Sequence, residues 1–392
     1  MTSHNAILCR LCHRLTNRPA LTLSGMPRFN HRLLQEHEVE SDAPVDMLVH
    51  RCDACGFVSL RAELACDYYD NYVNAPSSSP QVQAFLGEQA QVLVERFGLQ
   101  GLTVLEIGCG DGGFLAKLLQ AGAYARGIEP SRAQRDIALA QGLDVVDGLL
   151  TADRVLEGGP FDAFATRQVF EHVEDLHGFL AAIRAHLKSD GVGLVEVPNL
   201  DTLLAQDRFF DFIPEHVNYF SSRTLRLVLE MAGFEVVAID PVQGGEALRA
   251  LVRNLPPLAL DGLTRRIEPL RVEIAHFIDW RRALGERVAV WGAGGKGINL
   301  LAITALRGID LLVDADPHKE GRYTPASHLR VHRPEALRDH RIDAVVILAP
   351  AYRNEILHAL REKHGFEGAI GVVGDTFEVI EPVRNASAGR CC

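Results

Sequence analysis

The segment LTVLEIGCGDGG, residues 102–113, decides the fold expected for this chain. Its first half, Leu102 to Ile107, is a short apolar run with β-prone residues, as in a buried parallel strand. Glycines are concentrated between Gly108 and Gly113, and residues 114–120 then have helical periodicity. This order of strand, glycine turn and helix predicts a nucleotide-binding unit, because glycines without a Cβ let a ligand approach the backbone.

Two ligands compete for this turn, a dinucleotide and an adenosyl group. A dinucleotide requires G-x-G-x-x-G, so that its pyrophosphate meets the amides of a helix N-terminus. Here Glu106 lies at the end of the strand and Asp111 lies among the glycines. Carboxylates in these places repel pyrophosphate but attract a cation, such as the sulfonium and amino end of S-adenosylmethionine. The turn therefore favours the adenosyl donor, and a Rossmann domain without any nucleotide is the third alternative.

Acidic residues also lie at the carboxyl ends of the next two expected strands. The strand ARGI (125–128) ends at Glu129, where an acidic side chain accepts ribose hydroxyls in doubly wound nucleoside sites. Asp147 follows a third strand, from which its carboxylate is expected to reach the adenine amino group. The run FDAFATRQV (161–169) is the fourth expected strand and leads directly into FEHV (170–173).

Four cysteines near the N-terminus form two Cys-x-x-Cys pairs, Cys9 with Cys12 and Cys52 with Cys55. Each pair presents two thiolates from one tight turn, and two such turns supply the four ligands of a tetrahedral zinc site. Because thiolates take all four positions, none is open for water or substrate, and the zinc is expected to be structural. The alternative is four reduced cysteines without a metal.

The candidate reactive segment is IPEHVNYF, residues 213–220, which follows the expected strand VGLVEV (192–197). It brings a carboxylate, an imidazole and a phenol together on Glu215, His216 and Tyr219. Histidine titrates near neutral pH and can act as a base, with the adjacent carboxylate orienting it or taking the proton itself. In this class of fold, loops after the strands line the ligand site. The alternative is a surface turn anchored to the core by its aromatic residues.

Two further side chains are candidates for contact with a substrate. His172 comes directly after the fourth expected strand, where it contacts substrate, lines the donor pocket or caps a helix. Tyr72, with Tyr68 and Tyr69, precedes an expected interdomain linker. A phenol delivered from there can hydrogen-bond a substrate oxygen, or the tyrosines serve only packing.

A second glycine turn lies near residue 292. The strand RVAVW (287–291) is followed by GAGGKG (292–297), which fits G-x-G-x-x-G before a helix, and Asp314 and Asp316 close the next strand. Residues 260–284 have the spacing of a long connecting helix. The turn fits NAD, but Lys296 beside helix-start amides also suits a diphosphate. A domain that only packs and shapes the cleft is the third alternative.

Together, the four-cysteine segment, the E-x-G-x-G-x-G turn with Glu129 and Asp147, the EHVNYF loop and the second glycine turn resemble the nucleotide-sugar C-methyltransferases of deoxysugar biosynthesis. The resemblance covers essentially the whole chain. It implies an α/β protein with a zinc-binding module (1–75) and a Rossmann-like class I methyltransferase core dependent on S-adenosylmethionine (76–254). A second Rossmann-like domain (255–392) then helps to bind the substrate between the last two domains.

The resemblance also implies a reaction and its residues. A base removes the proton beside the ketone of a 4-keto-deoxysugar linked to a nucleotide, typically dTDP, and the carbanion at C3 attacks the methyl group of S-adenosylmethionine. Glu215 and His216 match the base and its partner, His172 a histidine near the sugar, and Tyr72 the linker tyrosine. Residues 74–76 (NAP) depart from the aromatic and serines that follow this tyrosine in the family. The match places the donor on Glu106, Gly108, Gly110, Asp111, Gly112, Glu129, Asp147 and Gln168, and the substrate on Asn218, Tyr219 and Lys296.

Composition restricts the partners and the compartment. A formal net charge of -11 argues against nucleic acid, since phosphate binding usually needs a basic surface. No apolar run approaches a membrane span, and the remaining cysteines (Cys66, Cys109, Cys391 and Cys392) form no disulfide framework. We expect a cytoplasmic enzyme, monomeric or weakly homo-oligomeric, that acts on a nucleotide sugar. The alternatives are O- or N-methylation of another small acceptor, and a zinc-containing scaffold whose glycine turns bind nothing.

Overall fold

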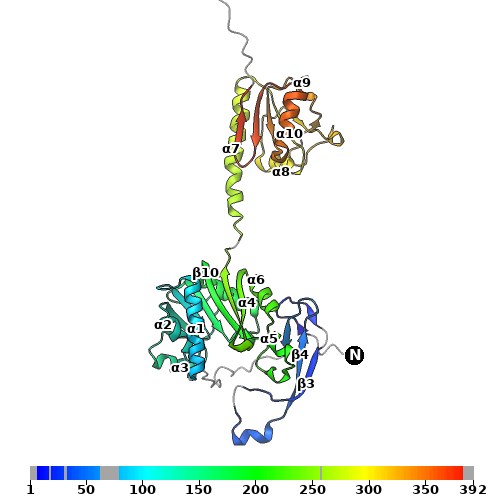
Figure 1. Ribbon diagram of the computed structural model, residues 1–392. Helices are drawn as coiled ribbons and strands as arrows, with labels where there is room; N and C mark the ends of the chain where they lie inside the picture. The colour runs from blue at the N-terminus through cyan, green and yellow to red at the C-terminus, as the bar shows by residue number, and fades with distance from the viewer. Residues whose placement is uncertain (1–6, 17–18, 31–32, 62–78, 257, 383–392) are drawn as a thin grey trace, which may run out of the picture. The chain divides into compact units, whose positions relative to one another are not determined.

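The computed structural model describes residues 7–16, 19–30, 33–61, 79–256 and 258–382. The chain divides into two compact units, Met1–Pro257 and Leu258–Cys392, and each is described by itself (Figure 1). Tyr72 and the two tyrosines before it lie outside the described residues. Within the described part of the chain, no helix is both long enough and apolar enough to cross a membrane.

A seven-stranded sheet forms the centre of the first unit, in the order β12-β13-β10-β9-β6-β7-β8. Strands β6 to β10 pair with one another in parallel, whereas β13 is antiparallel to both β10 and β12. The chain starts at β6 in the middle and builds outward in both directions, as in doubly wound folds. The strands are β6 (Thr103–Ile107), β7 (Tyr124–Glu129), β8 (Val145–Asp147), β9 (Phe161–Arg167), β10 (Leu187–Pro198), β12 (Phe234–Val242) and β13 (Ala247–Asn254).

Helices cover both faces of this sheet because its strands are apolar on both faces. In β9, Ala163 and Ala165 pack with helices α1 and α2, while Phe164 between them packs with α4 and α6. Helix α1 begins after Ser79, with Pro80 in its first turn, and ends at Gly98 in the left-handed conformation (φ 64°). The helices of this unit are α1 (Pro80–Phe97), α2 (Gly113–Gln120), α3 (Arg132–Ala140), α4 (Leu176–Ala185), α5 (Leu200–Ala205) and α6 (Ser222–Met231).

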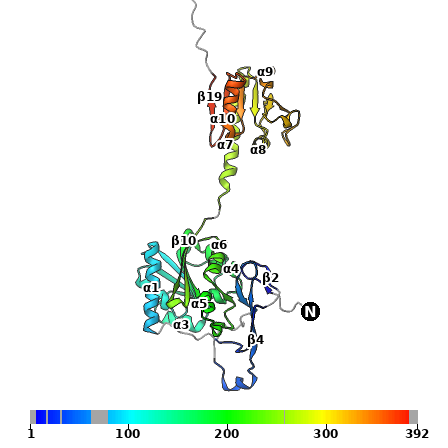
Figure 2. The same cartoon turned by 45° about the vertical axis from the view of Figure 1, so that its right-hand side comes forward.

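Residues 7–60, which contain the four cysteines and are called the cysteine segment here, belong to the same unit and form strands β1 to β5. Strands β1 (Ile7–Leu8) and β2 (Leu15–Thr16) form a hairpin, and a second sheet has the order β11-β5-β4-β3. Its strands are β3 (Leu21–Met26), β4 (Val45–Arg51), β5 (Val58–Leu60) and β11 (Asn218–Tyr219). Helix α5 packs against β4 of this sheet (Figure 2). Strand β11 comes from the candidate reactive segment, so this segment is part of the sheet of the cysteine segment.

The second unit contains a six-stranded sheet in the order β16-β15-β14-β17-β18-β19. All neighbouring strands are parallel except the β18–β19 pair. The strands are β14 (Val288–Trp291), β15 (Leu311–Val313), β16 (Val331–His332), β17 (Ala344–Ile347), β18 (Ala369–Val373) and β19 (Phe377–Ile380). The helices are α7 (Asp261–Ala283), α8 (Gly295–Thr304), α9 (Ala336–Asp339) and α10 (Arg353–His358). The expected connecting helix and second Rossmann-like α/β domain are confirmed.

Candidate active site

A cavity of about 940 Å³ lies in the first unit at the carboxyl ends of β6, β7, β9 and β10. This is where ligands bind in doubly wound sheets. Six of the predicted donor-binding residues line it: Glu106, Gly108, Gly110, Asp111, Glu129 and Gln168. His172 lines the same cavity, so one predicted catalytic side chain and most of the predicted donor site face a common space.

The glycine turn and the end of β7 are joined through the Glu129 carboxylate. The amide of Gly110 donates a hydrogen bond to Glu129 Oε2 (2.9 Å), and the amide of Ser131 donates to Oε1 (2.8 Å). Burial raises the pKa of Glu129, and these two N–H donors oppose the shift. A Cβ built on Gly110 would meet only Gln134 Oε1, at 4.0 Å, so the space above this glycine is left to a ligand.

Glu106 provides a buried carboxyl group at the wall of the cavity. Its side chain is almost completely buried, and its Oε2 has no hydrogen-bond partner among the described residues. Burial raises the pKa of Glu106 well above its ordinary value, and the charge of Arg167 opposes this shift. A cationic ligand would compensate the buried carboxylate, so the side chains of this half of the cavity fit S-adenosylmethionine.

Two predicted donor-binding residues do not line the cavity. A Cβ on Gly112 would lie 2.3 Å from Leu143 Cδ1, so this glycine permits close packing of α2. The Asp147 carboxylate is exposed and forms an ion pair with Arg135. Adenine contact by Asp147 and donor binding by Gly112 stay predictions.

Sequence reasoning missed other residues of the cavity wall. Arg167 and Glu196 form a buried ion pair (Nη2 to Oε1, 2.7 Å), and the Arg167 guanidinium also lies 4.9 Å from the centre of the Phe114 ring. The loop 148–152 after β8 lines the cavity as well. The available signal was a charged residue near the carboxyl end of each of two buried strands, since a buried charge requires a partner or a function.

His172 is held in one tautomer by the reactive segment. It ends the short 3-10 turn η3 (Phe170–His172), and its Nδ1 lies 2.9 Å from the main-chain oxygen of Glu215. A carbonyl oxygen only accepts hydrogen bonds, so Nδ1 carries the proton and Nε2 is the accepting nitrogen of the neutral ring. The ring of His216 contacts that of His172 edge to face, with centroids 4.9 Å apart. Burial lowers the pKa of both histidines, that of His216 to about 3 with a contribution from His172.

The other polar side chains of the reactive segment hold it in place. The hydroxyl of Tyr219 accepts from the amide of Ile213 (2.8 Å) and lies 3.2 Å from its carbonyl oxygen. Asn218 Nδ2 donates to the carbonyl oxygens of Phe170 (2.9 Å) and Val173 (2.6 Å). Tyr219 and Asn218 are therefore anchors of the segment, and their contact with substrate stays a prediction.

Within the described part of the chain, Glu215 and His216 are not part of the cavity wall, although His216 contacts His172, which is. The carboxylate of Glu215 is buried and accepts a hydrogen bond from the amide of Asn30 (2.6 Å). This carboxylate therefore contacts the cysteine segment, and its charge also favours the protonated form of His172. The assignment of Glu215 and His216 as base and partner stays a prediction.

The cysteine segment positions the reactive segment. Asn218 and Tyr219 pair with Ser59 and Val58 of β5, and the amide of Leu60 donates to Val217 O (3.0 Å). Arg10, between two of the cysteines in sequence, donates from Nη1 to the carbonyl oxygens of Leu60 (2.8 Å) and Val217 (3.2 Å). The position of the two histidines thus depends on pairing with β5, the strand that follows Cys55.

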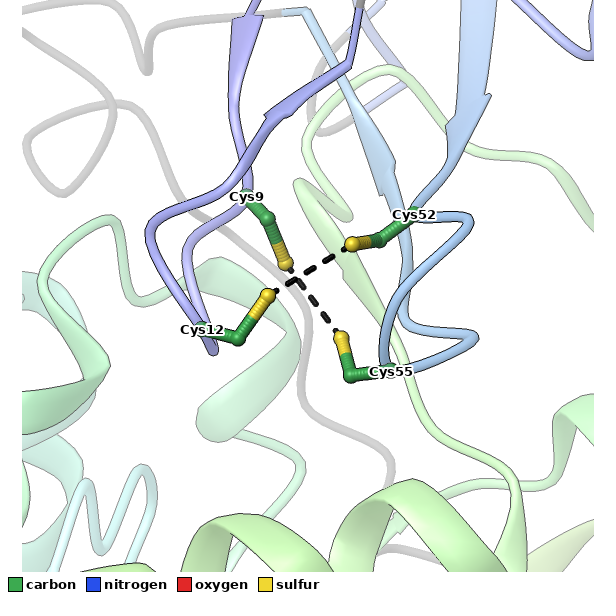
Figure 3. Close-up of side chains that lie close together, drawn as sticks. All are labelled: Cys9, Cys12, Cys52 and Cys55. Carbon is green, nitrogen blue, oxygen red and sulfur yellow. Dashed lines mark hydrogen bonds between the residues drawn. The ribbon is translucent and has the colours of Figure 1, made fainter.

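The four cysteines converge with their sulfur atoms facing one another (Figure 3). The Sγ atoms of Cys9 and Cys55 are 3.6 Å apart, and those of Cys12 and Cys52 are 3.5 Å apart. A tetrahedral zinc with bonds of about 2.3 Å to sulfur has sulfur–sulfur edges of roughly 3.8 Å. Burial raises the pKa of Cys9 and Cys55, which disfavours thiolates unless a cation binds. The quartet fits a structural zinc ion.

A second group of potential metal ligands occurs beside the cavity. Glu171, His172 and His216 each offer one ligand atom, and these atoms lie within 4.8 Å of one another. Glu171 is 1% exposed, and neither carboxylate oxygen has a hydrogen-bond partner among the described residues. We call these three residues the acid–histidine cluster.

In the second unit, Lys296 is exposed in the first turn of α8. Asp314, which closes β15, accepts from the amides of Ala293 (2.7 Å) and Asp316 (2.9 Å) and from Lys319 Nζ (3.0 Å). Sequence reasoning missed Lys319, which follows β15 within a few residues. The part of Lys296 in binding a diphosphate stays a prediction.

Comparison with known proteins finds a match to a family model in each of the two units. Residues 81–239 match a family described as a methyltransferase domain, and residues 257–372 match a C-methyltransferase C-terminal domain. The C-methyltransferase NovU of Streptomyces niveus is 28% identical over 388 residues, which cover 90% of this chain and 92% of that protein.

Two further comparisons cover less of the chain. A ubiquinone biosynthesis O-methyltransferase of Caulobacter vibrioides is 36% identical over 127 residues, which cover 30% of this chain and only 50% of that protein. The crystal structure of magnesium protoporphyrin IX methyltransferase from Synechocystis PCC 6803 with bound SAH is 18% identical, with a TM-score of 0.36 over 44% of this chain and 83% of that one.

Proposed function

This chain is a methyltransferase with a class I core and the C-terminal domain of the C-methyltransferases, and from this premise we propose that it methylates carbon. The methyl donor is S-adenosylmethionine, which supplies an electrophilic methyl group. The acceptor is a nucleotide-linked, dTDP-type, 4-keto-deoxysugar, and the methylated atom is C3, beside the ketone. The assignment of sugar and position rests on the sequence resemblance.

One observation carries the proposal: His172, which contacts the ring of His216, lines the same cavity as Glu106 and Glu129, the carboxylates predicted to bind the donor. A carbon acid must lose a proton before it can attack the sulfonium methyl, so C-methylation requires a base beside the donor site. General base catalysis contributes about 10²–10⁴-fold to such a step. His172 faces the cavity and His216 supports it, so the pair is the base in this proposal.

The other residues of the proposed site bind the donor and the substrate or hold the reactive segment in place. Glu106 and Glu129 hold the cationic donor, and the segment anchored by Asn218 and Tyr219 keeps the histidine pair at the acceptor. Zinc on the cysteine quartet cross-links the sheet that holds this segment. Lys296 binds the diphosphate of the substrate.

Solvent exchange tests the proposal. We expect the enzyme, in D₂O without S-adenosylmethionine, to introduce deuterium at C3 of a dTDP-4-keto-deoxysugar, as followed by proton NMR. His172→Gln is expected to slow the exchange at least about 100-fold, as loss of a general base requires. Methyl transfer to a hydroxyl or amine without any exchange would instead establish O- or N-methylation.

A further inference from the structure

The two histidines of the proposed base do not by themselves offset the cost of the buried positive charge that forms when one of them takes up a proton. His172 and His216 are neutral and buried, and their rings contact each other with centroids 4.9 Å apart. A proton taken up by either ring creates a buried positive charge beside a second imidazole. Burial disfavours such a charge unless a negative group compensates it.

Glu171 is the side chain that compensates this charge. It precedes His172 in η3, and its carboxylate is fully buried within 4.8 Å of the ligand atoms of both histidines. Both of its oxygens lack hydrogen-bond partners among the described residues, which is costly for a carboxylate that serves only packing. The proposed roles of the reactive segment leave this carboxylate without a function.

We propose that Glu171, His172 and His216 act as one base, in which the Glu171 carboxylate supplies the negative charge that balances the proton taken from the acceptor. This inference rests on the proposed function. The carbon–hydrogen bond of the acceptor breaks, its electron pair stays on the enolate, and the proton moves to the cluster. The cluster passes from a charge of -1 to neutral, and it returns to its starting state by releasing the proton to water.

The charged and titratable neighbours agree with a shared proton. Burial raises the pKa of Glu171 to about 8, with a smaller contribution from Glu196. Glu196 is paired with Arg167. The pKa of Tyr219 is raised by burial and also by the charge of Glu171. Glu215 favours a proton on His172. When sites interact this strongly, the proton belongs to the group as a whole.

The test compares Glu171→Gln with the wild-type full chain. Glutamine keeps the shape but cannot carry negative charge, so we expect C3 deuterium exchange and kcat to fall at least 100-fold with KM within threefold. The alkaline-rising limb of the kcat profile should be lost, and Glu171→Asp should restore part of the rate. Glu230→Gln, an exposed carboxylate on α6 paired with Arg226, is the matched control and should behave as wild type.

A second measurement does not depend on the acceptor. In NMR titrations, the ring signals of His172 and His216 should shift near pH 8 in the wild type, as the cluster takes up its proton. In Glu171→Gln this shift should be absent. This result stands even if the acceptor is not a keto-sugar, so it separates a failure of this inference from a failure of the proposed function.

Three outcomes would overturn the inference. The first is an unchanged pH profile and rate in Glu171→Gln, which would make Glu171 structural. The second is unchanged histidine titration in that variant. The third is a second, tightly bound divalent ion per chain whose removal abolishes exchange, because the cluster would then hold a metal in place of a proton.

Discussion

Replacing Asn218 by alanine tests whether the reactive segment is held by side-chain hydrogen bonds or contacts the substrate directly. Asn218 is 1% exposed, and its Nδ2 donates to the carbonyl oxygens of Phe170 and Val173 at 2.9 and 2.6 Å. These carbonyls flank His172, so the asparagine joins β11 to the turn that presents this histidine.

The expected loss of stability follows from these contacts. Asn218→Ala removes two buried hydrogen bonds and leaves two carbonyl oxygens unpaired, which costs about 2–4 kcal/mol. The Asn218 Oδ1 atom has no partner within the described part of the chain, and its removal offsets part of this cost. We therefore expect a loss of about 2–3 kcal/mol, or roughly 5–10 °C in the melting temperature of a unit of this size.

Calorimetric unfolding, donor titration and C3 deuterium exchange measure the three consequences. We expect Asn218→Ala to lower the melting temperature, to slow exchange at least tenfold, and to leave the affinity for S-adenosylmethionine unchanged. Asn254→Ala is the matched control, because Asn254 is also buried and donates to a main-chain oxygen, that of Lys188, at 3.0 Å. It should lose stability but keep the exchange rate measured well below its melting temperature.

The opposite pattern would refute this reasoning. If Asn218→Ala melts with the wild type and exchanges at the wild-type rate at saturation, but with a higher KM, then Asn218 binds substrate and does not hold the segment.

Three further predictions follow from the geometry of the first unit. Gly110→Ala should weaken S-adenosylmethionine at least tenfold in calorimetry, whereas Gly142→Ala, which also has positive φ but has no atom near its Cβ, should strain the backbone equally and leave the affinity unchanged. Cys52→Ser should lower bound zinc, measured by elemental analysis, from one ion per chain to none. It should also speed hydrogen exchange of the β11 amides at least tenfold, since β11 pairs with β5. Unchanged exchange would show that the four cysteines do not stabilise the reactive segment. The pKa of His216 in the folded protein is about 3, below the ordinary 6.5, so the unfolded state binds the proton first and stability is lost as pH falls below 6.5. At pH 5 this loss is about 2 kcal/mol. Urea unfolding of His216→Gln should therefore show a smaller loss of stability between pH 7 and pH 5 than the wild type.

The sequence predicted the elements whose signals are local. The strand-turn-helix at residues 102–120 is observed as β6 and α2, and the long helix expected near residues 260–284 is α7. Periodicity and turn chemistry depend only on neighbours along the chain, which is why these predictions are confirmed. The spacing of the cysteines likewise predicted four sulfur atoms that converge on one point.

Local pattern could not separate ligand contact from packing. Gly112 shares the turn with Gly110, but one glycine lies against Leu143 and the other lines the cavity. Asp147 closes a strand as Glu129 does, but its carboxylate is exposed and paired with Arg135. In each case the deciding contact is with a residue from another element, and a motif does not specify it.

By itself, then, the sequence determined the class of the fold, the two Cys-x-x-Cys turns and the glycine turn with its carboxylates, because backbone preference and side-chain spacing act over a few residues. Only the tertiary structure decided that β11 pairs with β5, and that Glu171 is buried without a partner beside His172 and His216. The physical reason is that burial and strand pairing join residues far apart in the chain: Asn218 meets Ser59 across the sheet, and the free energy of a buried carboxylate depends on everything packed around it.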